Sequence, residues 1–249
     1  MAEIEPIERQ DGRLRDVFSY PHFSESHYLK VLRDLEALGV HQILSKGEFE
    51  IRSVRVVGKG WVGIVCVAYL EGKEVALKVR RSDANRASMK NEGELLSAAN
   101  SCAVGPNLLR CTENVLAMEY IEGPFISAWL KSQPEKGQVR GAVLELLEQC
   151  FRLDAGGVDH GELSDSKKHI IVNHLGKPHI IDFETASRKR KCRNLVSMVG
   201  YLFFKDSIGE LLKPHFVWDK EALKEIIRHY KAQPSAENYR KVCAHLGFT

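Results

Sequence analysis

Apolar and polar residues alternate in the segment 48–79, and this alternation predicts paired β-strands. A strand over 48–57 precedes a group of glycines, and two further strands flank a turn at 71–73. Successive side chains of a strand point to opposite faces, so Lys78 shares its face with Ala76 and not with its apolar neighbours. The segment therefore predicts a small antiparallel sheet in which a lysine lies beside a small residue.

Apolar residues at three- and four-residue spacing predict helices in the rest of the chain. The clearest begins after Ser24, a candidate N-cap, and ends at Gly39. It is either half of a helix-turn-helix or, as we favour, a helix packed on the back of the sheet. Further helices are expected over 82–99, 125–130, 138–155, 195–204, 208–212, 220–231 and 236–246, and strand pairs at 108–110 with 115–119 and at 170–172 with 180–181. Residues 1–23 lack a sustained periodic face and are expected to form an irregular arm.

Composition restricts the class of protein without indicating a function. Of the 249 residues, 44% are apolar and 28% are charged, as in ordinary globular proteins. The net charge of +3 is too small to indicate a nucleic-acid partner by itself. The charged N-terminus lacks a secretory apolar segment, and the longest apolar run, 195–204, is shorter than the roughly 20 residues that span a bilayer. We therefore expect no membrane partner. Six scattered cysteines form no CxxC pair, so we expect reduced thiols and a cytoplasmic protein.

The glycines Gly58, Gly60 and Gly63 identify the first candidate site. A dinucleotide-binding fingerprint requires a helix after its last glycine, and a Walker loop ends in Gly-Lys-Ser/Thr; this chain has neither. Instead a second strand returns with Lys78 in VALK. Glycine lets a phosphate approach the backbone, and a lysine on the next strand can pair with it. A purely structural hairpin is the alternative, but this lysine favours a nucleotide-binding loop.

Two further segments belong to this candidate site. A carboxylate on the helix after the lysine can hold its ammonium toward phosphate. We choose Glu92, because Glu94 lies two residues away and faces roughly the opposite side of the helix. A solvated glutamate is the alternative. The strand 115–119 ends in an open connection, where the backbone at Glu119 and Ile121 is expected to meet an adenine edge.

A second group of polar residues surrounds the strand pair 170–172 and 180–181. The loop before the pair contains HGEL, with His160 and Glu162, and the second strand ends in Asp182. Glu162 and Asp182 are therefore expected to lie close together at one end of the pair. Phosphoryl transfer uses one carboxylate to hold Mg²⁺ and another to orient the attacking hydroxyl. For His160 we favour a structural role, in which it orients the loop through hydrogen bonds.

The order of these motifs resembles that of the protein-kinase-like superfamily over residues 50–205: GxGxxGxV, VALK, a helix glutamate, MEYIEG, HGEL and DFE. HGEL is similar to the HGDL of minimal kinases, which include the RIO kinases and the small kinases associated with tRNA threonylcarbamoylation. The chain looks most like a group of predicted archaeal-type serine/threonine kinases with HGEL and DFE. The resemblance implies a two-lobed α+β fold: an N-terminal arm and helix (1–47), an antiparallel-sheet N-lobe (48–119) and a truncated, mainly helical C-lobe (120–249).

The resemblance also implies a role for each matching residue. Lys78, Glu162 and Asp182 would be the catalytic residues, with Glu162 in the position of the catalytic aspartate. Asp182 would ligate Mg²⁺. The residues implied to bind ATP are Gly58, Gly60, Gly63, Val65, Ala76, Lys78, Glu92, Glu119 and Ile121.

Three positions depart from the pattern of the family. Glu162 replaces an aspartate and carries its carboxylate one methylene further out. The usual asparagine is Lys167 or, with a two-residue insertion, His169, and neither is a good ligand for a hard cation. Glu184 replaces the glycine of DFG and can supply an extra oxygen ligand. Despite these departures, the metal set expected from the aligned positions is Asp182, Glu184 and His169.

The basic run 188–193 follows DFE directly, with neither a long activation segment nor an Ala-Pro-Glu motif. The peptide-docking platform of large kinases is therefore reduced or missing. The run either docks an acidic or RNA-associated substrate or, as we favour, is a solvated loop.

The function expected from the resemblance is Mg-ATP-dependent phosphoryl transfer to a hydroxyl by an atypical serine/threonine protein kinase, whose protein substrates include itself. One alternative is a small-molecule kinase of the choline or aminoglycoside type. The other is a nucleotide-binding pseudokinase or scaffold, whose ATP state switches a ribosomal or tRNA-modifying partner.

Overall fold

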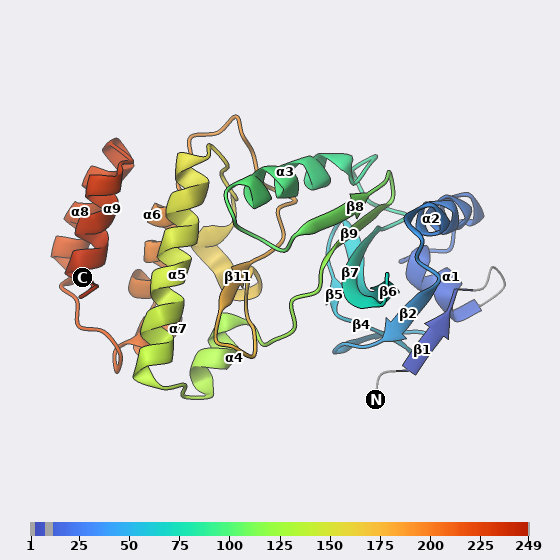
Figure 1. Ribbon diagram of the computed structural model, residues 1–249, viewed down its shortest axis with the longest axis horizontal. Helices are drawn as coiled ribbons and strands as arrows, with labels where there is room; N and C mark the ends of the chain where they lie inside the picture. Colours follow the sequence, from blue (N-terminus) through green and yellow to red (C-terminus); the bar gives the residue numbers. More distant parts are fainter. Residues whose placement is uncertain (1–2, 8–11, 249) are drawn as a thin grey trace. The chain divides into compact units, whose positions relative to one another are not determined.

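The computed structural model describes residues 3–7 and 12–248, and the protein belongs to the α+β class, with antiparallel sheets and helices (Figure 1). It divides into two compact units. The first unit comprises Met1–Glu94 and Asn107–Tyr120, and the second comprises Leu95–Pro106 and Ile121–Thr249. None of the helices in the described part of the chain has the length and the apolar character that a membrane crossing requires.

The first unit is built on an antiparallel sheet with the strand order β1-β2-β6-β7-β9-β8, in which β5 also pairs with β6. Its strands are β1 (Glu3–Pro6), β2 (Gln42–Ser45), β5 (Gly58–Lys59), β6 (Gly63–Leu70), β7 (Lys73–Arg80), β8 (Leu108–Cys111) and β9 (Val115–Glu119). The single strand expected over 48–57 is instead a hairpin of β3 (Phe49–Ile51) and β4 (Val54–Val56). Arg52 and Ser53 turn the chain there with φ of 49° and 68°.

Two helices, α1 (Gly12–Phe18) and α2 (Glu25–Leu38), precede most of the sheet. The expected limits of α2 are confirmed: the Ser24 side chain accepts a hydrogen bond from the first turn, and Gly39 ends the helix with φ of 76°. Apolar residues of α2 share one core with the sheet, which confirms the favoured packing.

The irregular arm expected over 1–23 was a wrong prediction, because the described part of this segment contains β1 and α1. The apolar stripe of α1, formed by Leu14, Val17 and Phe18, is too short to be recognised as periodic, yet it is buried in the core of the unit.

The helix expected over 82–99 is α3 (Lys90–Ser101), which begins eight residues later than predicted. In the loop before α3, polar side chains form hydrogen bonds that are not those of a helix. The Ser82 hydroxyl is placed to donate to the carbonyls of Ser19, Tyr20 or His22, which lie 2.9 to 3.1 Å away and are distant in sequence. The Ser88 hydroxyl accepts from the backbone N–H of Lys90. A tertiary contact thus replaces the helical hydrogen bonds of this loop.

The second unit is mainly helical and contains one short hairpin, within the described residues. Its helices are α4 (Ile126–Lys131), α5 (Lys136–Ala155), α6 (Asn194–Val199), a π-helical turn (Gly200–Phe204), α7 (Asp206–Leu212), α8 (Lys220–Ala232) and α9 (Ala236–His245). The hairpin consists of β10 (Ile170–Val172) and β11 (Pro178–Ile180), and a 3₁₀ helix (Leu163–Lys168) precedes it. The long helix α5 packs on α6 and β11, and α8 packs on α9 (Figure 1).

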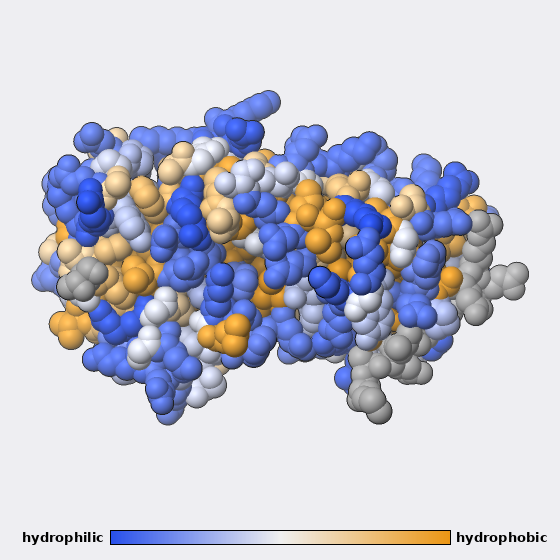
Figure 2. Space-filling model, viewed as in Figure 1, coloured by the Kyte–Doolittle hydropathy of each residue, from blue (hydrophilic) through white to orange (hydrophobic). Residues whose placement is uncertain are grey.

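On the face drawn in Figure 2, hydrophilic residues predominate and apolar residues are scattered among them. Three large apolar side chains stand out by their exposure, namely Trp61, Leu175 and Val217. Only Trp61 belongs to a segment that the sequence marks as a candidate site.

Candidate active site

The glycine segment is a tight hairpin between β5 and β6, as the sequence predicted. The backbone N–H of Gly60 donates to the carbonyl of Gly63 at 2.9 Å, which closes the turn. At its tip Trp61 is 89% exposed, whereas Val62 is buried. A Cβ atom on Gly63 would lie 2.8 Å from Cγ of Lys78, closer than packed atoms approach. Glycine is therefore required for β6 to pass this close to the lysine.

Arg81 fastens this turn from the end of β7. Its backbone N–H donates to the carbonyl of Val62 at 2.8 Å, and its guanidinium donates to the carbonyl of Gly60 at 2.9 Å. The same guanidinium forms two hydrogen bonds of 2.8 Å with the Asp83 carboxylate. No sequence pattern marks Arg81, because its contacts with the turn depend on how β6 and β7 pair.

One face of the sheet carries the lysine and its expected neighbours. In the β6–β7 register, Val65 pairs with Lys78 and Val67 with Ala76, so that Val65, Ala76 and Lys78 lie on a common face. The alternate residues Leu77 and Val79 belong to the core on the opposite face. The alternation read from the sequence is thereby confirmed.

Lys78 and Glu92 form a buried ion pair, which confirms the choice of Glu92. Lys78 Nζ lies 2.8 Å from Glu92 Oε1, and both side chains are only 5% exposed. Glu94 is exposed to solvent. Gly93, between them, allows α3 to approach the sheet, since a Cβ there would lie 2.8 Å from Cys111 Sγ. Such a pair is expensive to desolvate, so its position in the fold has to be well determined.

Glu119, the last residue of β9, is hydrogen-bonded to Asn107 through both its backbone and its side chain. The Glu119 backbone N–H donates to the carbonyl of Asn107 at 2.9 Å, and its carboxylate accepts two hydrogen bonds from the same asparagine, at 3.1 and 2.8 Å. The chain passes from the first unit into the second between Tyr120 and Ile121. The backbone segment expected to meet a base edge is therefore one of the points at which the chain passes between the two units.

In the second unit, His160 anchors the HGEL loop. Its ring is fully buried, and Nε2 lies 3.0 Å from the carbonyl of Ile181. Its backbone N–H donates to Asn194 Oδ1 at 2.9 Å. Burial lowers the pKa of the His160 imidazole to about 4, so the ring is neutral at pH 7 and Nε2–H is the donor. The structural role favoured from the sequence is confirmed.

Glu162 and Asp182 approach the same imidazole. His169 Nε2 lies 3.7 Å from Glu162 Oε2, and His169 Nδ1 lies 3.9 Å from Asp182 Oδ2. The two carboxylates are therefore brought together at one end of the β10–β11 pair, as expected. Their side chains are 42% and 35% exposed, whereas that of His169 is 15% exposed. Asp182 has φ of 68°, in the left-handed region that few residue types other than glycine adopt.

The expected metal set is not assembled as a cluster. Among the residues that the structure describes, no three His, Cys, Asp or Glu side chains form a group that could hold a metal ion. Asp182, Glu184 and His169 thus do not constitute a ready three-ligand site. The partly exposed carboxylates of Asp182 and Glu162 nevertheless fit Mg²⁺, because this ion is usually bound by one or two carboxylates, with waters and phosphates as its other ligands.

After DFE, Thr185 contacts Glu162 directly, and Arg190 contacts Thr185; no sequence motif marks either residue. The Thr185 hydroxyl lies 3.1 Å from Glu162 Oε2. Arg190, in the basic run, donates to Asp159 Oδ2 at 2.9 Å and to the carbonyl of Thr185 at 2.7 Å. The basic residues of the run are exposed to solvent, as favoured from the sequence, and Arg190 in addition links the run to Asp159, which precedes HGEL.

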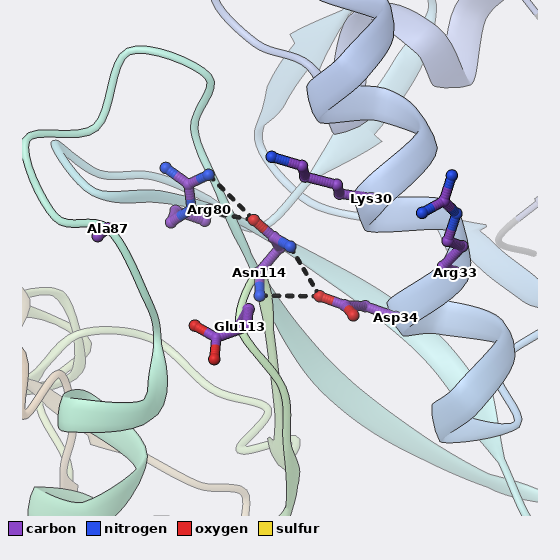
Figure 3. A pocket seen from close by; sticks show the side chains of 7 residues that line it. All are labelled: Lys30, Arg33, Asp34, Arg80, Ala87, Glu113 and Asn114. Carbon is purple, nitrogen blue, oxygen red and sulfur yellow. Dashed lines mark hydrogen bonds between the residues drawn. The ribbon is translucent and has the colours of Figure 1, made fainter.

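A separate cavity of about 380 Å³ lies in the first unit, between α2 and the β8–β9 turn (Figure 3). It is lined by Lys30, Arg33, Asp34, Arg80, Ala87, Glu113 and Asn114. Arg80 donates to Asn114 Oδ1 at 3.0 and 3.1 Å, and Asn114 in turn donates to Asp34 at 2.8 and 2.9 Å. These contacts join the walls of the cavity to one another. None of the site residues expected from the sequence lines it.

Comparison with known proteins adds a relative but no function. No protein-family profile matches the chain. The curated Uncharacterized protein MJ1211 of Methanocaldococcus jannaschii is 24% identical over 117 residues, which amount to 46% of this chain and 98% of that protein. Its name states no activity, so the similarity leaves the chemistry to be argued from the residues.

Proposed function

We propose that this protein has a protein-kinase-like fold and transfers a phosphoryl group from Mg-ATP to a hydroxyl, as an atypical serine/threonine protein kinase. The observation that carries the proposal is the buried Lys78–Glu92 pair, in which Nζ lies 2.8 Å from Oε1. Lys78 is on β7, the strand that follows the glycine hairpin, and Glu92 is on α3. An ordinary structural lysine is solvated, since lysine is rarely buried. Burial of this ammonium beside a glycine turn is the arrangement used to pair with nucleotide phosphates.

Each residue then has a defined task. Lys78 pairs with phosphate oxygens while Glu92 fixes the direction of its ammonium. Val65 and Ala76 provide an apolar surface for a base on the same face of the sheet. The N–H of Glu119 already binds the carbonyl of Asn107. We therefore assign the contact with a base edge to the carbonyl of Glu119 and the N–H of Ile121.

In the second unit the two carboxylates have different tasks. Asp182 offers oxygen ligands to Mg²⁺, and Glu162 receives the proton of the acceptor hydroxyl. Bound Mg-ATP supplies the phosphoryl group and the charge-neutralising cation. A second candidate function is a nucleotide-binding pseudokinase, favoured by the residues Glu162, Lys167 and Glu184 at positions where the resembled family has other residues.

The test is ATP turnover and self-phosphorylation with labelled ATP and Mg²⁺. We expect activity in the wild type and loss in Lys78→Arg, Glu92→Gln and Asp182→Asn. The matched controls Lys73→Ala and Glu94→Gln, on the same strand and helix but exposed, should retain activity. Stabilisation by ATP without turnover would favour the pseudokinase, and label on added choline or aminoglycoside alone would indicate a small-molecule kinase. A folded wild type that neither binds nor hydrolyses ATP would refute the proposal.

A further inference from the structure

The Thr185 hydroxyl is shared between two oxygen atoms. It lies 3.1 Å from Glu162 Oε2 and 3.0 Å from the carbonyl oxygen of His160. An ionised carboxylate and a carbonyl only accept hydrogen bonds, so the hydroxyl is the donor in either contact. A hydrogen bond to a carboxylate is roughly twice as strong as one between neutral groups. The hydroxyl proton therefore acts mainly on Glu162.

Thr185 is itself held rigidly. Its carbonyl accepts a hydrogen bond of 2.7 Å from Arg190, which also binds Asp159. Gly161 has φ of 94°, and a Cβ there would lie 3.1 Å from the Thr185 hydroxyl and 2.5 Å from Arg190 Nη2. Only glycine lets the HGEL loop pass so close to these groups. A β-branched side chain is also stiff at χ1, which further limits the directions that the hydroxyl can take.

The Thr185–Glu162 contact matters because the carboxylate of a glutamate side chain has several accessible orientations. Glu162 has one more rotatable bond than aspartate, and its side chain is 42% exposed. A hydrogen bond at Oε2 removes much of this freedom and leaves Oε1 for an attacking hydroxyl. We propose that Thr185 is a positioning residue, which fixes the Glu162 carboxylate for proton transfer from the phosphoryl acceptor. The inference rests on the proposed phosphoryl-transfer function.

The test compares Thr185→Val, Thr185→Ser and the wild type in ATP turnover, with kcat and the KM for ATP measured separately. Thr185→Val removes the hydroxyl and nearly keeps the shape. We expect kcat to fall about tenfold to a hundredfold, the range for a hydrogen bond to a charged group, with the KM for ATP unchanged. Thr185→Ser restores the hydroxyl and should recover kcat to within about threefold of the wild type, since serine is less stiff at χ1.

Two further variants separate positioning from a structural effect. Thr112→Val removes a hydroxyl that bonds to both backbone groups of Val115, in the other unit, and should leave kcat unchanged. In Glu162→Asp the shorter side chain withdraws from Thr185, so adding Thr185→Val should cost little more. A wild-type kcat in Thr185→Val would overturn the inference while the proposed function stood. A kcat of Thr185→Ser as low as that of Thr185→Val would do the same. A wild type without ATP turnover would overturn both.

Discussion

The two units present their charged groups in opposite ways. In the first, Lys78 and Glu92 are in contact at 2.8 Å and almost completely buried. In the second, Glu162 and Asp182 remain 42% and 35% exposed, and each lies more than 3.5 Å from the histidine between them. The ion pair of the first unit is therefore sealed from solvent, whereas the two carboxylates of the second unit are partly exposed. Substitution of Lys78 or Glu92 should therefore cost stability as well as activity, whereas substitution of Glu162 or Asp182 should cost mainly activity.

The largest expected effect is the loss of one member of the buried pair. Lys78→Ala or Glu92→Ala should lower the free energy of unfolding by about 3–5 kcal/mol, because the remaining charge is buried without its ion-pair partner. The double variant Lys78→Met/Glu92→Leu should cost clearly less than the sum of the two single changes. Urea unfolding measures these values, with Lys73→Ala as the exposed control. A loss below about 1 kcal/mol would mean that the pair behaves as a surface ion pair.

The second expected effect concerns His160, the buried histidine of the HGEL loop in the second unit. Burial lowers the pKa of His160 from 6.5 to about 4, so the unfolded chain binds a proton that the folded protein excludes. This contribution to stability is present above pH 6.5 and is lost as the pH falls toward 4, by about 3 kcal/mol in total. His160→Gln should flatten the pH dependence of the unfolding free energy over this window. If both proteins show the same slope, the imidazole is not kept neutral by the fold.

A smaller effect is expected at the glycine turn. Gly63→Ala should destabilise the protein by about 1–3 kcal/mol, because the added methyl meets Lys78 and the Val79 carbonyl at 2.8 and 3.0 Å. Gly141→Ala, in the exposed interior of α5 with no atom near its Cβ, should instead stabilise by about 0.5–1 kcal/mol. Thermal unfolding of the two variants gives the signs. Equal shifts would show that the turn has room to relax around Lys78.

The smallest effect on stability is expected at Asp182. Asp182→Asn should change the unfolding free energy by less than about 0.5 kcal/mol, because asparagine also tolerates the φ of 68° and the side chain is partly exposed. The same variant should abolish ATP turnover under the proposed function. Chemical denaturation and a turnover assay on one preparation measure both. A destabilisation as large as that of Lys78→Ala would remove the contrast between the two units.

Local patterns predicted much of the site in the first unit. Period-two alternation placed Lys78 and Ala76 on one face, and helical spacing selected Glu92 over Glu94; both were correct. These inferences succeed because the direction of a side chain within one strand or helix depends on the backbone repeat alone. The ends of α2 were predictable for a similar reason, since Ser24 and Gly39 act on their own helix.

The remaining errors involve contacts between distant segments. The loop before α3 was expected to be helical, but Ser82 bonds to residues 19–22 instead. The helix α1 was missed because its short apolar stripe is recognisable only once it is packed. In both cases burial and long-range hydrogen bonds outweighed local propensity, which differs between ordinary residues by less than about 1 kcal/mol.

The sequence by itself determined the hairpin, the lysine, its helix partner and the pairing of strands around the HGEL and DFE motifs. Only the tertiary structure showed that His169 lies between Glu162 and Asp182, and that Thr185 and Arg190 fasten the same loop. These contacts depend on left-handed backbone angles at Gly161 and Asp182, which redirect the chain by amounts that no repeat encodes. Periodicity specifies the faces of an element, whereas the meeting of two loops is decided by individual torsion angles and by what they bring within hydrogen-bonding distance.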